Sequence, residues 1–555
     1  MKKFAVILAA IVGGILIGLY MQPLISEDNI YQQINKFKDI LLTASKNYVE
    51  EVDTQKLVEA AIRGMLNQLD PHSVYITADE MKQVNEDFQG SFEGIGVQFT
   101  ILNDTITVEQ PIPGGPSDLL GIQSGDKIVK INDTSAVGIT NADVQKKLKG
   151  PKGTKVVVDI YRRGTQGLLH FVITRDKIPL YSVEDYFMID GTDIGVVKVG
   201  RFSATTHREM MEALGKLKDK GMKKLILDLR NNPGGYLNQA YLVADEFVHG
   251  GDTIVYTKGR RSEFDEVYIG ANGGDYENIP LIVMINAGSA SASEIVSGAI
   301  QDLDRGLIVG TTSFGKGLVQ RQFTCNDGSA YRLTISRYYT PSGRCIQRPY
   351  KDKDRYRHLA GRLDLEEGSY LNNPIKKIRE QVDKMNDGKV MGKDKDYIDF
   401  DSLPIFRTKH GRLVFGDGGI TPDYIVKIDT TSFNKLFFDI LSKNLFFEFA
   451  NDYIHGKGSG LKDKYQINFL DYLRNWEVSD EMIKEFKKMV VSHGVTWDDK
   501  LYKQSEEVIK NDIKTSIARI IWDDNRATQI FSKTDNQLMK AAELFPDAEK
   551  IMRMK

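Results

Sequence analysis

The chain carries the stretch Leu-Ile-Val-Met-Ile-Asn-Ala-Gly-Ser-Ala-Ser-Ala-Ser-Glu at positions 281–294. Its first five residues are apolar, which is typical of a buried strand. The small residues that follow predict a turn, and a helix is expected over 291–303. Strands and helices alternate around this stretch from 180 to 345, which predicts an α/β domain whose sheet is covered by helices. The other strands are expected at 194–199, 224–229 and 307–310, and the other helices at 204–220 and 237–248.

The turn offers a serine nucleophile, and Ser291 is one of its candidates. Ser291 lies where the turn meets the helix, and the first N–H groups of a helix have no partner within it. With the helix dipole, these groups can stabilise an oxyanion, so Ala292 N–H is one expected donor. The second donor is expected from Gly234 or Gly235, with Gly235 favoured, in the turn directly after the strand at 224–229.

Lys316 is the expected general base. It lies in the segment Thr-Ser-Phe-Gly-Lys-Gly-Leu-Val-Gln at 312–320. A serine hydroxyl attacks an amide only if another group takes its proton, and a lysine can do so if burial lowers its pKa. Because Ser-Lys is a known nucleophile–base pair, the two segments predict peptide-bond hydrolysis without a catalytic histidine.

Each segment also has a structural alternative. The small-residue segment could be a flexible turn with a helix N-cap, and Gly315–Gly317 a simple surface turn. Ser289 and Ser293 compete with Ser291, and local chemistry alone does not choose among the three hydroxyls.

Several segments, in the same order, resemble those of the carboxy-terminal processing peptidases, also called tail-specific proteases. The resemblance covers roughly residues 30–345 and resumes at 416–426. It implies a serine-type endopeptidase with a PDZ domain between an N-terminal helical segment and a crotonase-like protease core. The segments are Leu-Asp-Pro-His-Ser at 69–73, Asp-Leu-Arg-Asn-Asn-Pro-Gly-Gly at 228–235, Gly-Ser-Ala-Ser-Ala-Ser-Glu at 288–294, Phe-Gly-Lys-Gly-Leu-Val-Gln at 314–320 and Thr-Pro-Ser-Gly-Arg at 340–344.

The resemblance also implies roles for individual residues. Ser291 matches the nucleophile, Lys316 the base, and Gln320 a residue that orients the lysine. Ala292 and one glycine of the pair at 234–235 match the oxyanion hole. The reaction would pass through an acyl-enzyme.

Gly94-Ile95-Gly96-Val97 resembles the PDZ loop whose N–H groups bind a C-terminal carboxylate. The tail would then add to the domain as an extra strand, so proteins or peptides with free C-termini are the expected substrates. Taken alone, these four residues fit a glycine-rich β-hairpin better.

Length, charge and the absence of certain motifs narrow the expected number of domains, the partners and the cofactors. A length of 555 residues predicts three or four domains, and a net charge of −2 gives no reason to propose nucleic acid as a partner. CxxC, HExxH, GxSxG and P-loop patterns are absent from the sequence, so neither a metal nor another cofactor is expected. Cys325 and Cys345 could form a disulfide or remain isolated thiols.

The N-terminus predicts a membrane segment. Lys2 and Lys3 precede an apolar, uncharged run of 18 residues from Phe4 to Met21, at the lower limit for spanning a bilayer. The lysines would stay in the cytoplasm and the remainder would lie outside it, on the periplasmic side. An anchor in the cytoplasmic membrane is favoured over a cleaved signal peptide, because no small-x-small cleavage site is evident near 20–26.

These patterns divide the chain into five expected parts, and two rival functions stay open: a non-catalytic PDZ scaffold that senses protein tails, and an acyl-transfer enzyme on a crotonase-like core. The sequence allows a homo-oligomer but does not determine the oligomeric state, the physiological substrates or the cleavage-site preference. The expected parts are a signal anchor or signal peptide at 1–25, a helical segment at 26–88, a PDZ domain at 89–177, a peptidase core at 178–430 with a charged insertion of unassigned role at 346–415, and a helical domain of unassigned role at 431–555.

Overall fold

The structure is a computed structural model, and it describes residues 30–271, 273–350, 365–371, 374–391, 393–394 and 397–554. The expected membrane segment at 4–21 lies outside these residues. None of the described helices is both long enough and apolar enough to cross a bilayer. The chain divides into two compact units: one takes in the described residues up to Ala78 together with Arg321–Leu333, and the other takes in Asp79–Gln320 with Thr334 to the C-terminal end.

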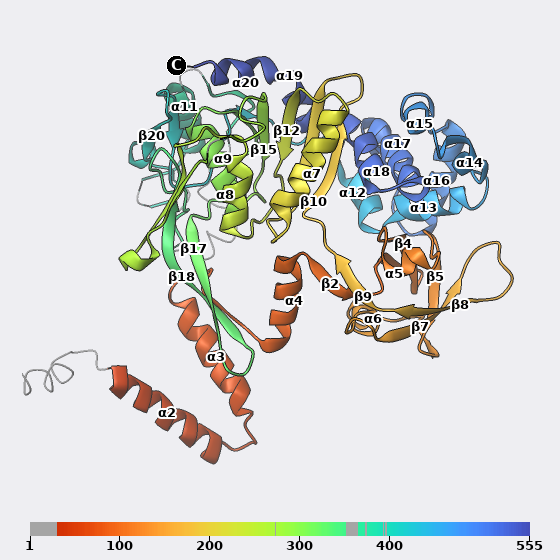
Figure 1. Ribbon diagram of the computed structural model, residues 1–555, viewed down its shortest axis with the longest axis horizontal. Coiled ribbons are helices and arrows are strands. Elements are labelled where there is room, and N and C mark those ends of the chain that lie inside the picture. The colour runs from red at the N-terminus through yellow and green to blue at the C-terminus, as the bar shows by residue number, and fades with distance from the viewer. Residues whose placement is uncertain are drawn as a thin grey trace, which may run out of the picture. The chain divides into compact units, whose positions relative to one another are not determined.

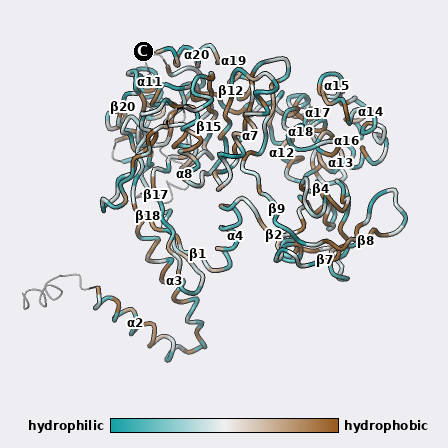
Figure 2. The backbone as a smooth tube through the Cα atoms, viewed as in Figure 1, coloured by the Kyte–Doolittle hydropathy of each residue, from teal (hydrophilic) through white to brown (hydrophobic). Residues whose placement is uncertain are grey.

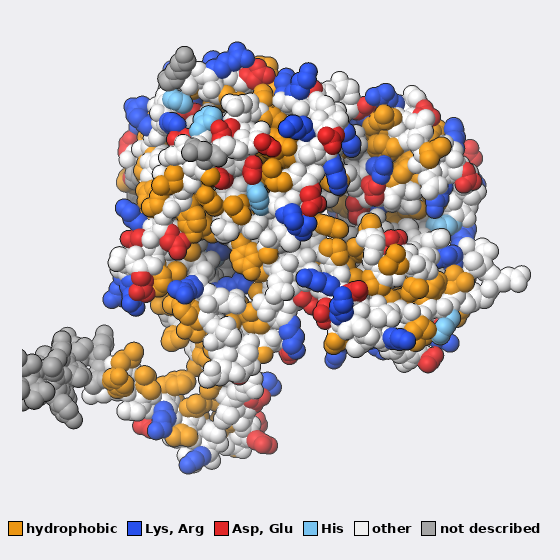
Figure 3. Space-filling view, in the orientation of Figure 1, with side chains coloured by type: hydrophobic (Ala, Val, Ile, Leu, Met, Phe, Trp, Pro, Cys, Tyr) orange, Lys and Arg blue, Asp and Glu red, His pale blue; other side chains and the backbone are white. Residues whose placement is uncertain are grey.

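The described residues of the first unit form two helices, strand β1 (Val74–Ile76), the end of β17 (Leu318–Thr324) and the beginning of β18 (Ala330–Tyr339). Helices α2 (Ile30–Asn47) and α3 (Thr54–Asn67) occupy the stretch expected to be helical, and Asp53 caps α3 by accepting the N–H of Lys56 at 3.1 Å. Strand β1 pairs antiparallel with the beginning of β18. Figures 2 and 3 show apolar residues along α2 and α3. The larger exposed ones include Ile30, Ile34, Phe37, Ile40, Leu57 and Met65.

The second unit contains the expected α/β core (Figure 1). Its main sheet has the strand order β10-β11-β12-β15-β16-β22-β19. Neighbours from β11 to β22 are parallel, and the two edge strands are antiparallel to their partners. The elements of this layer are β10 (Val183–Met188), β11 (Ile194–Val199), α7 (Thr206–Asp219), β12 (Lys224–Asp228), α8 (Leu237–Asp245), β15 (Leu281–Ile285), α9 (Ala292–Asp302), β16 (Leu307–Gly310), β19 (Gly368–Ser369) and β22 (Tyr424–Ile425).

Helices cover both faces of this sheet, because its inner strands carry apolar side chains on both sides. Leu225 and Leu227 of β12 face the layer of α7, α8 and α9. Ile226 faces the other way, toward α19 (Asn536–Glu543) and α20 (Phe545–Met552). The last two helices of the chain therefore pack on the core sheet and not within the helical cluster that precedes them. Helix α9 is the centre of the first layer, since every one of its residues is buried.

A smaller sheet and an irregular region complete the core. In the smaller sheet, the end of β18 pairs antiparallel with β13. Cys325 and Cys345 are free thiols, so the structure contains no disulfide between them. The remaining elements are β13 (Thr253–Gly259), η2 (Ser262–Phe264), β14 (Val267–Ile269), β17 (Leu318–Thr324), α11 (Pro374–Met385), η3 (Phe400–Ser402), β20 (Ile405–Arg407) and β21 (Leu413–Phe415).

The expected PDZ domain precedes the core. Its six-stranded sheet has the order β3-β4-β5-β7-β8, with β6 on β5, and β2 pairs with β9 beside it. Helix α4 (Ala78–Gln89) leads into this domain, and its last turn contacts the core: Phe88 O accepts the N–H of Ala204 at 2.9 Å, and the Phe88 ring packs edge-on against Tyr236. The elements are β2 (Ser91–Gly94), β3 (Val97–Leu102), β4 (Thr105–Pro111), α5 (Pro116–Leu119), β5 (Lys127–Ile131), β6 (Thr134–Ser135), α6 (Asn141–Leu148), β7 (Lys155–Tyr161), β8 (Leu169–Thr174) and β9 (Asp176–Pro179).

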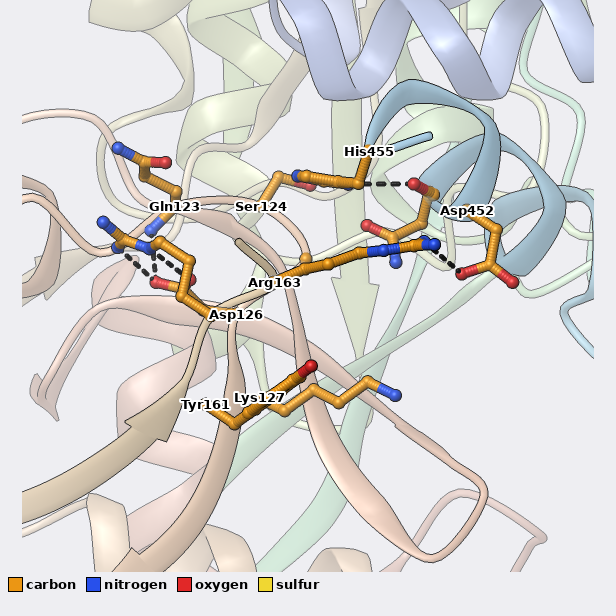
Figure 4. Close-up of a pocket in the computed structure, with 11 residues that line it drawn as sticks. Gln123, Ser124, Asp126, Lys127, Tyr161, Arg163, Asp452 and His455 are labelled. Atoms are coloured by element: carbon orange, nitrogen blue, oxygen red, sulfur yellow. Dashed lines mark hydrogen bonds and ion pairs between the residues drawn. The ribbon is translucent and has the colours of Figure 1, made fainter. Parts of the chain in front are cut away.

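The C-terminal helices before α19 form their own apolar cluster and contact the PDZ domain through polar groups. Asn103 donates to Glu448 at 3.1 Å, and Gln110 donates to Asp524 at 2.5 Å. Figure 4 shows a pocket at this contact, where Arg163 reaches Asp452 and His455 lies opposite Ser124. The helices are α12 (Lys435–Ser442), α13 (Leu445–Ile454), α14 (Gly460–Tyr465), α15 (Phe469–Asn475), α16 (Asp480–Ser492), α17 (Asp499–Ile521) and α18 (Asp524–Phe531), followed by η4 (Ser532–Thr534).

Arg344 holds the C-terminal end of α9. Its Nη2 lies 2.7 Å from Asp302 Oδ1, and both side chains are fully buried. The same guanidinium donates to Gln301 Oε1 at 2.6 Å and to Phe415 O at 2.8 Å. The segment Thr-Pro-Ser-Gly-Arg at 340–344 therefore supplies a cation where the helix dipole favours one.

We expect Arg344→Met to lower the free energy of unfolding of the core by about 3–5 kcal/mol, because it leaves the Asp302 carboxylate buried without its cation. Thermal unfolding followed by circular dichroism measures this loss. The control is Arg208→Met on α7, which breaks the exposed Arg208–Glu212 pair and should cost about 0.5 kcal/mol. Equal shifts in the two variants would contradict the expectation.

Candidate active site

Ser291 lies in a strained turn between β15 and α9. Its φ of 54° is positive, a conformation that residues with a side chain rarely adopt. The turn is held against the loop after β12, since Asn232 O accepts the N–H of Ala290 at 3.0 Å and the hydroxyl of Ser293 at 2.9 Å. Asn232 is itself fixed, because its Nδ2 donates to Val199 O at 2.7 Å. The strand–turn–helix order expected from the sequence is thus present, with the serine at the helix N-cap.

The three serines of this segment differ in their surroundings. Ser289 is 1% exposed, and its Oγ donates to Leu229 O at 2.8 Å and accepts the N–H of Asn286 at 2.9 Å. Ser293 is fully buried and donates to Asn232 O. Ser291 is partly exposed. Of the three hydroxyls, that of Ser291 is therefore the one that a substrate can reach.

Glu294 joins the two segments singled out in the sequence. Its Oε2 accepts the N–H of Ser291 at 2.8 Å and the N–H of Lys316 at 2.9 Å. Its Oε1 accepts the hydroxyl of Ser313 at 2.5 Å and the N–H of Gly315 at 2.6 Å. One carboxylate thus fixes the backbone of both the serine turn and the lysine loop.

The carboxyl of Glu294 is fully buried, and this burial raises its pKa to about 7, although the four hydrogen bonds act in the opposite direction. Only the ionised form can accept all four donors. The arrangement is therefore complete above about pH 7 and is weakened as the pH falls below that value.

Tyr338, on β18, gives a second link between the same two segments. Its Oη lies 3.2 Å from Ser291 O and also within hydrogen-bond distance of Lys316 O. Its own N–H donates to Gly317 O at 3.0 Å. Because the ring is 1% exposed, it cannot swing away without disturbing the core. Ser291 and Lys316 are thus neighbours in space.

Lys316 lies in the loop before β17 and is partly buried. Gly315 has a φ of +87°, and a Cβ there would lie 2.5 Å from Arg348 Cγ, so this loop requires glycine. Gln320 lies on β17, and its Nε2 donates to Leu318 O at 3.2 Å and Thr334 Oγ1 at 3.5 Å.

The two glycines expected in the oxyanion hole lie beside the serine turn. A Cβ on Gly234 would come within 2.8 Å of Ser291 Cβ and 3.0 Å of Ala292 N. The N–H of Gly234 already donates to Asn232 Oδ1 at 2.9 Å. Within the described part of the chain, neither Ala292 N–H nor Gly235 N–H donates to a side chain or to a loop carbonyl. This difference favours Gly235 over Gly234 as a donor to substrate.

The residues at 94–97 form the bend between β2 and β3 of the expected PDZ domain. Ile95 O accepts the N–H and the hydroxyl of Ser117 at 3.1 and 2.7 Å, which ties the bend to α5. Ile95, Gly96 and Val97 line a groove of about 260 Å³ that α6 borders on one side. The bend therefore opens into a groove, as a tail-binding loop requires.

Sequence reasoning missed the roles of Glu294, Tyr338 and Asn232. Glu294 could have been found, because a glutamate three residues after Ser291 has the spacing of a capping box and is the one charge in the apolar first two turns of the helix. Tyr338 and Asn232 act through contacts between distant segments, and no local pattern points to them.

We expect Glu294→Gln to lower kcat of the expected peptide hydrolysis by about a hundredfold. The amide offers one acceptor oxygen in place of two, so two of the four donors lose their partner, and each hydrogen bond to a charged group contributes about 1.5–3 kcal/mol. The fall in wild-type kcat that accompanies protonation of Glu294 near pH 7 should be missing from the variant's profile. Steady-state kinetics across a pH series measures both effects.

Asp304→Asn is the matched control for this variant. Asp304 is another buried carboxylate, just beyond the far end of α9, which accepts from His410 N–H at 2.7 Å and Arg412 Nε at 2.5 Å. Its replacement should destabilise the protein and leave kcat of the folded enzyme unchanged. Equal losses of kcat in the two variants would show that Glu294 supports the fold and not the site.

Family profiles match most of the chain. The description Peptidase family S41 matches residues 193–355, and PDZ domain matches 107–162. Activating protease CtpB N-terminal domain matches 21–80, and a family of unknown function matches 436–523.

Curated relatives match as well. A carboxy-terminal-processing protease of Bartonella bacilliformis is 41% identical over 327 residues, which cover 58% of this chain and 74% of the relative. Carboxy-terminal processing protease CtpA of Bacillus subtilis is 34% identical over 322 residues, which cover 58% of this chain and 67% of the relative.

Two solved structures show similarity. The photosystem II D1 C-terminal processing protease is 29% identical, and the match covers 58% of this chain and 86% of that protein's chain, with a TM-score of 0.32. The PDZ domain of a carboxy-terminal protease from Vibrio cholerae, in complex with a peptide, is 32% identical and covers 16% of this chain and 99% of its own, with a TM-score of 0.16.

The order of segments noted in the sequence, the S41 and PDZ matches and the identity to these relatives agree with one another. The chain therefore belongs to the carboxy-terminal processing proteases of peptidase family S41 and is a serine-type peptidase.

Proposed function

We propose that this chain is an extracytoplasmic serine endopeptidase that binds protein C-termini in its PDZ domain and cleaves through Ser291 and Lys316. One observation carries the catalytic assignment: Glu294 accepts the backbone N–H groups of both residues through one oxygen, at 2.8 and 2.9 Å. The two residues are far apart in the sequence, yet one carboxylate holds their backbones together. Because Ser291 is partly exposed, this arrangement favours a catalytic pair over a contact that serves packing alone.

The proposed reaction is acyl transfer. Lys316 Nζ takes the proton of Ser291 Oγ as the oxygen attacks the scissile carbonyl carbon, and the N–H groups of Ala292 and Gly235 stabilise the oxyanion. The lysine then gives its proton to the leaving amine as the peptide bond breaks. It next takes a proton from water, which attacks the acyl-enzyme; as the bond to Ser291 Oγ breaks, the lysine returns this proton to that oxygen and the new C-terminus is released. Gln320 would orient the lysine.

The proposed substrates are proteins or peptides with free C-termini. Two observations support this class. The bend at 94–97 opens into the groove beside α6, and the related PDZ domain of Vibrio cholerae was solved with a peptide. A tail bound as an added strand would place the backbone before it within reach of the core.

The proposed location follows from the N-terminal residues. Lys2 and Lys3 before the apolar run at 4–21 support an anchor in the cytoplasmic membrane, with the peptidase on the periplasmic side. No nucleic acid partner or cofactor is part of the proposal, and a homo-oligomer is compatible with it.

Ser291→Ala should reduce cleavage of a tailed, unfolded substrate by about 10⁴-fold or more, with no change in thermal unfolding. Ser289→Ala and Ser293→Ala should remain active but lose about 1–2 kcal/mol of stability, because each hydroxyl makes a buried hydrogen bond. The three variants are compared by substrate cleavage and by thermal melts. Near wild-type turnover in Ser291→Ala would mean that another group is the nucleophile.

Lys316→Arg should be inactive at every pH from 6 to 10, although the positive charge is kept, because a guanidinium does not lose its proton in proteins. Wild-type activity should rise with pH as the Lys316 ammonium deprotonates, and Gln320→Ala should lower activity less than Lys316→Ala. The pH–rate profiles are compared with those of Lys435→Arg, a matched change at an exposed position on α12. Substantial turnover in Lys316→Arg would mean that another group is the base.

A further inference from the structure

One lysine lies beside the loop expected to bind the substrate's terminal carboxylate. Lys149 follows the last residue of α6 and lines the same groove as Ile95, Gly96 and Val97. Its Cα lies 3.6 Å from the position that a Cβ on Gly94 would occupy, so its backbone abuts the loop. Among the described residues that line the groove, it is the one basic side chain.

The ammonium of Lys149 already holds a carboxylate. Its Nζ lies 2.6 Å from Glu86 Oε2 and 4.8 Å from the centre of the Phe92 ring, so it is directed along the groove and not away from it. Both charged side chains are about two-thirds buried, with 34% and 29% of their surface exposed. Glu86 comes from α4, which lies outside the strands of the PDZ domain and contributes Gln83 and Asp87 to the same groove.

The other charges near the groove have their own partners. Asp87 pairs with Arg201 of the core at 3.3 Å, and Lys152 pairs with Asp176 on the exposed side of the domain at 2.5 Å. Arg175 donates to the carbonyls of Lys147 and Leu148 at the end of α6 and to that of Lys155 at the start of β7. The Lys149–Glu86 pair is therefore the cation–carboxylate pair that a tail entering the groove would meet.

We propose that Lys149 binds the α-carboxylate of the substrate's C-terminus and that Glu86 occupies Lys149 when no tail is bound. This rests on the proposed capture of free C-termini by the PDZ domain. The chemistry of the two ligands is the same: each is a carboxylate that accepts from the ammonium. Exchange of one for the other never leaves the partly buried lysine without an anion, which would be costly. Glu86 is thus an internal competitor. The binding free energy that Lys149 contributes to a tail is the difference between its pairing with the tail and its pairing with Glu86.

The test measures binding to full-length protein carrying Ser291→Ala, so that the probe stays intact. A short fluorescein-labelled peptide with an apolar last residue is used as free acid and as C-terminal amide, and fluorescence anisotropy gives both affinities. The parent should prefer the acid by about tenfold. Lys149→Gln should abolish that preference, and Lys149→Arg should retain most of it. Glu86→Gln should tighten binding of the acid by about two- to fivefold and leave the amide unchanged.

Lys152→Gln is the matched control, since it removes a lysine from an ion pair of the same domain outside the groove, and it should keep the parent's preference. A preference that survives in Lys149→Gln, or acid binding that does not tighten in Glu86→Gln, would overturn the role of this pair while leaving tail capture intact. A parent that binds acid and amide equally would overturn tail capture, and this inference with it. Thermal melts establish that each variant is folded before its affinities are compared.

Discussion

The carboxylate of Glu294 is the constraint on which the arrangement of the site depends. A carboxylate removed from water must receive hydrogen bonds from the protein, and this one receives four from two separate segments. Neither segment can leave its place without leaving a buried charge short of donors. This explains how Ser291 is kept at a positive φ and how a glycine-flanked loop, which has many conformations open to it, is held beside the serine.

Helix α9 connects Glu294 to the core, because the helix is buried along its whole length and fixed at both ends. Glu294 fixes the first turn, and Asp302 with Arg344 fixes the last. The turn that carries Gly234 and Gly235 is supported from elsewhere. Arg230, in that turn, pairs with Asp228 and with Asp535 at the N-cap of α19, each at 2.6 Å. A residue near the end of the chain thus stabilises a loop some three hundred positions earlier.

Helix α4 connects the PDZ groove to the core. Glu86 binds Lys149 in the groove, and two residues later Phe88 packs on Tyr236, which directly follows Gly235. The same helix therefore contacts both the place where a tail would bind and the loop that would hold the oxyanion. The helical domain contacts the PDZ domain through polar pairs such as Asn103–Glu448. Domains joined by polar interfaces move relative to each other more readily than domains joined by large apolar ones.

The sequence by itself determined the elements and the type of chemistry, since both depend on local signals. Apolar runs and turn residues place β15 at Leu281–Ile285 and α7 at Thr206–Asp219 where they were expected, and segment order indicates the family. Only the tertiary structure decided which of the three serines is reachable, what Glu294 and Tyr338 contact, and that α19 and α20 cover the core sheet although the sequence groups them with the preceding helices. The physical reason is that burial and hydrogen-bond partners are set by segments far apart in the chain. A hydroxyl that donates to Leu229 O and one that faces solvent have the same local sequence around them.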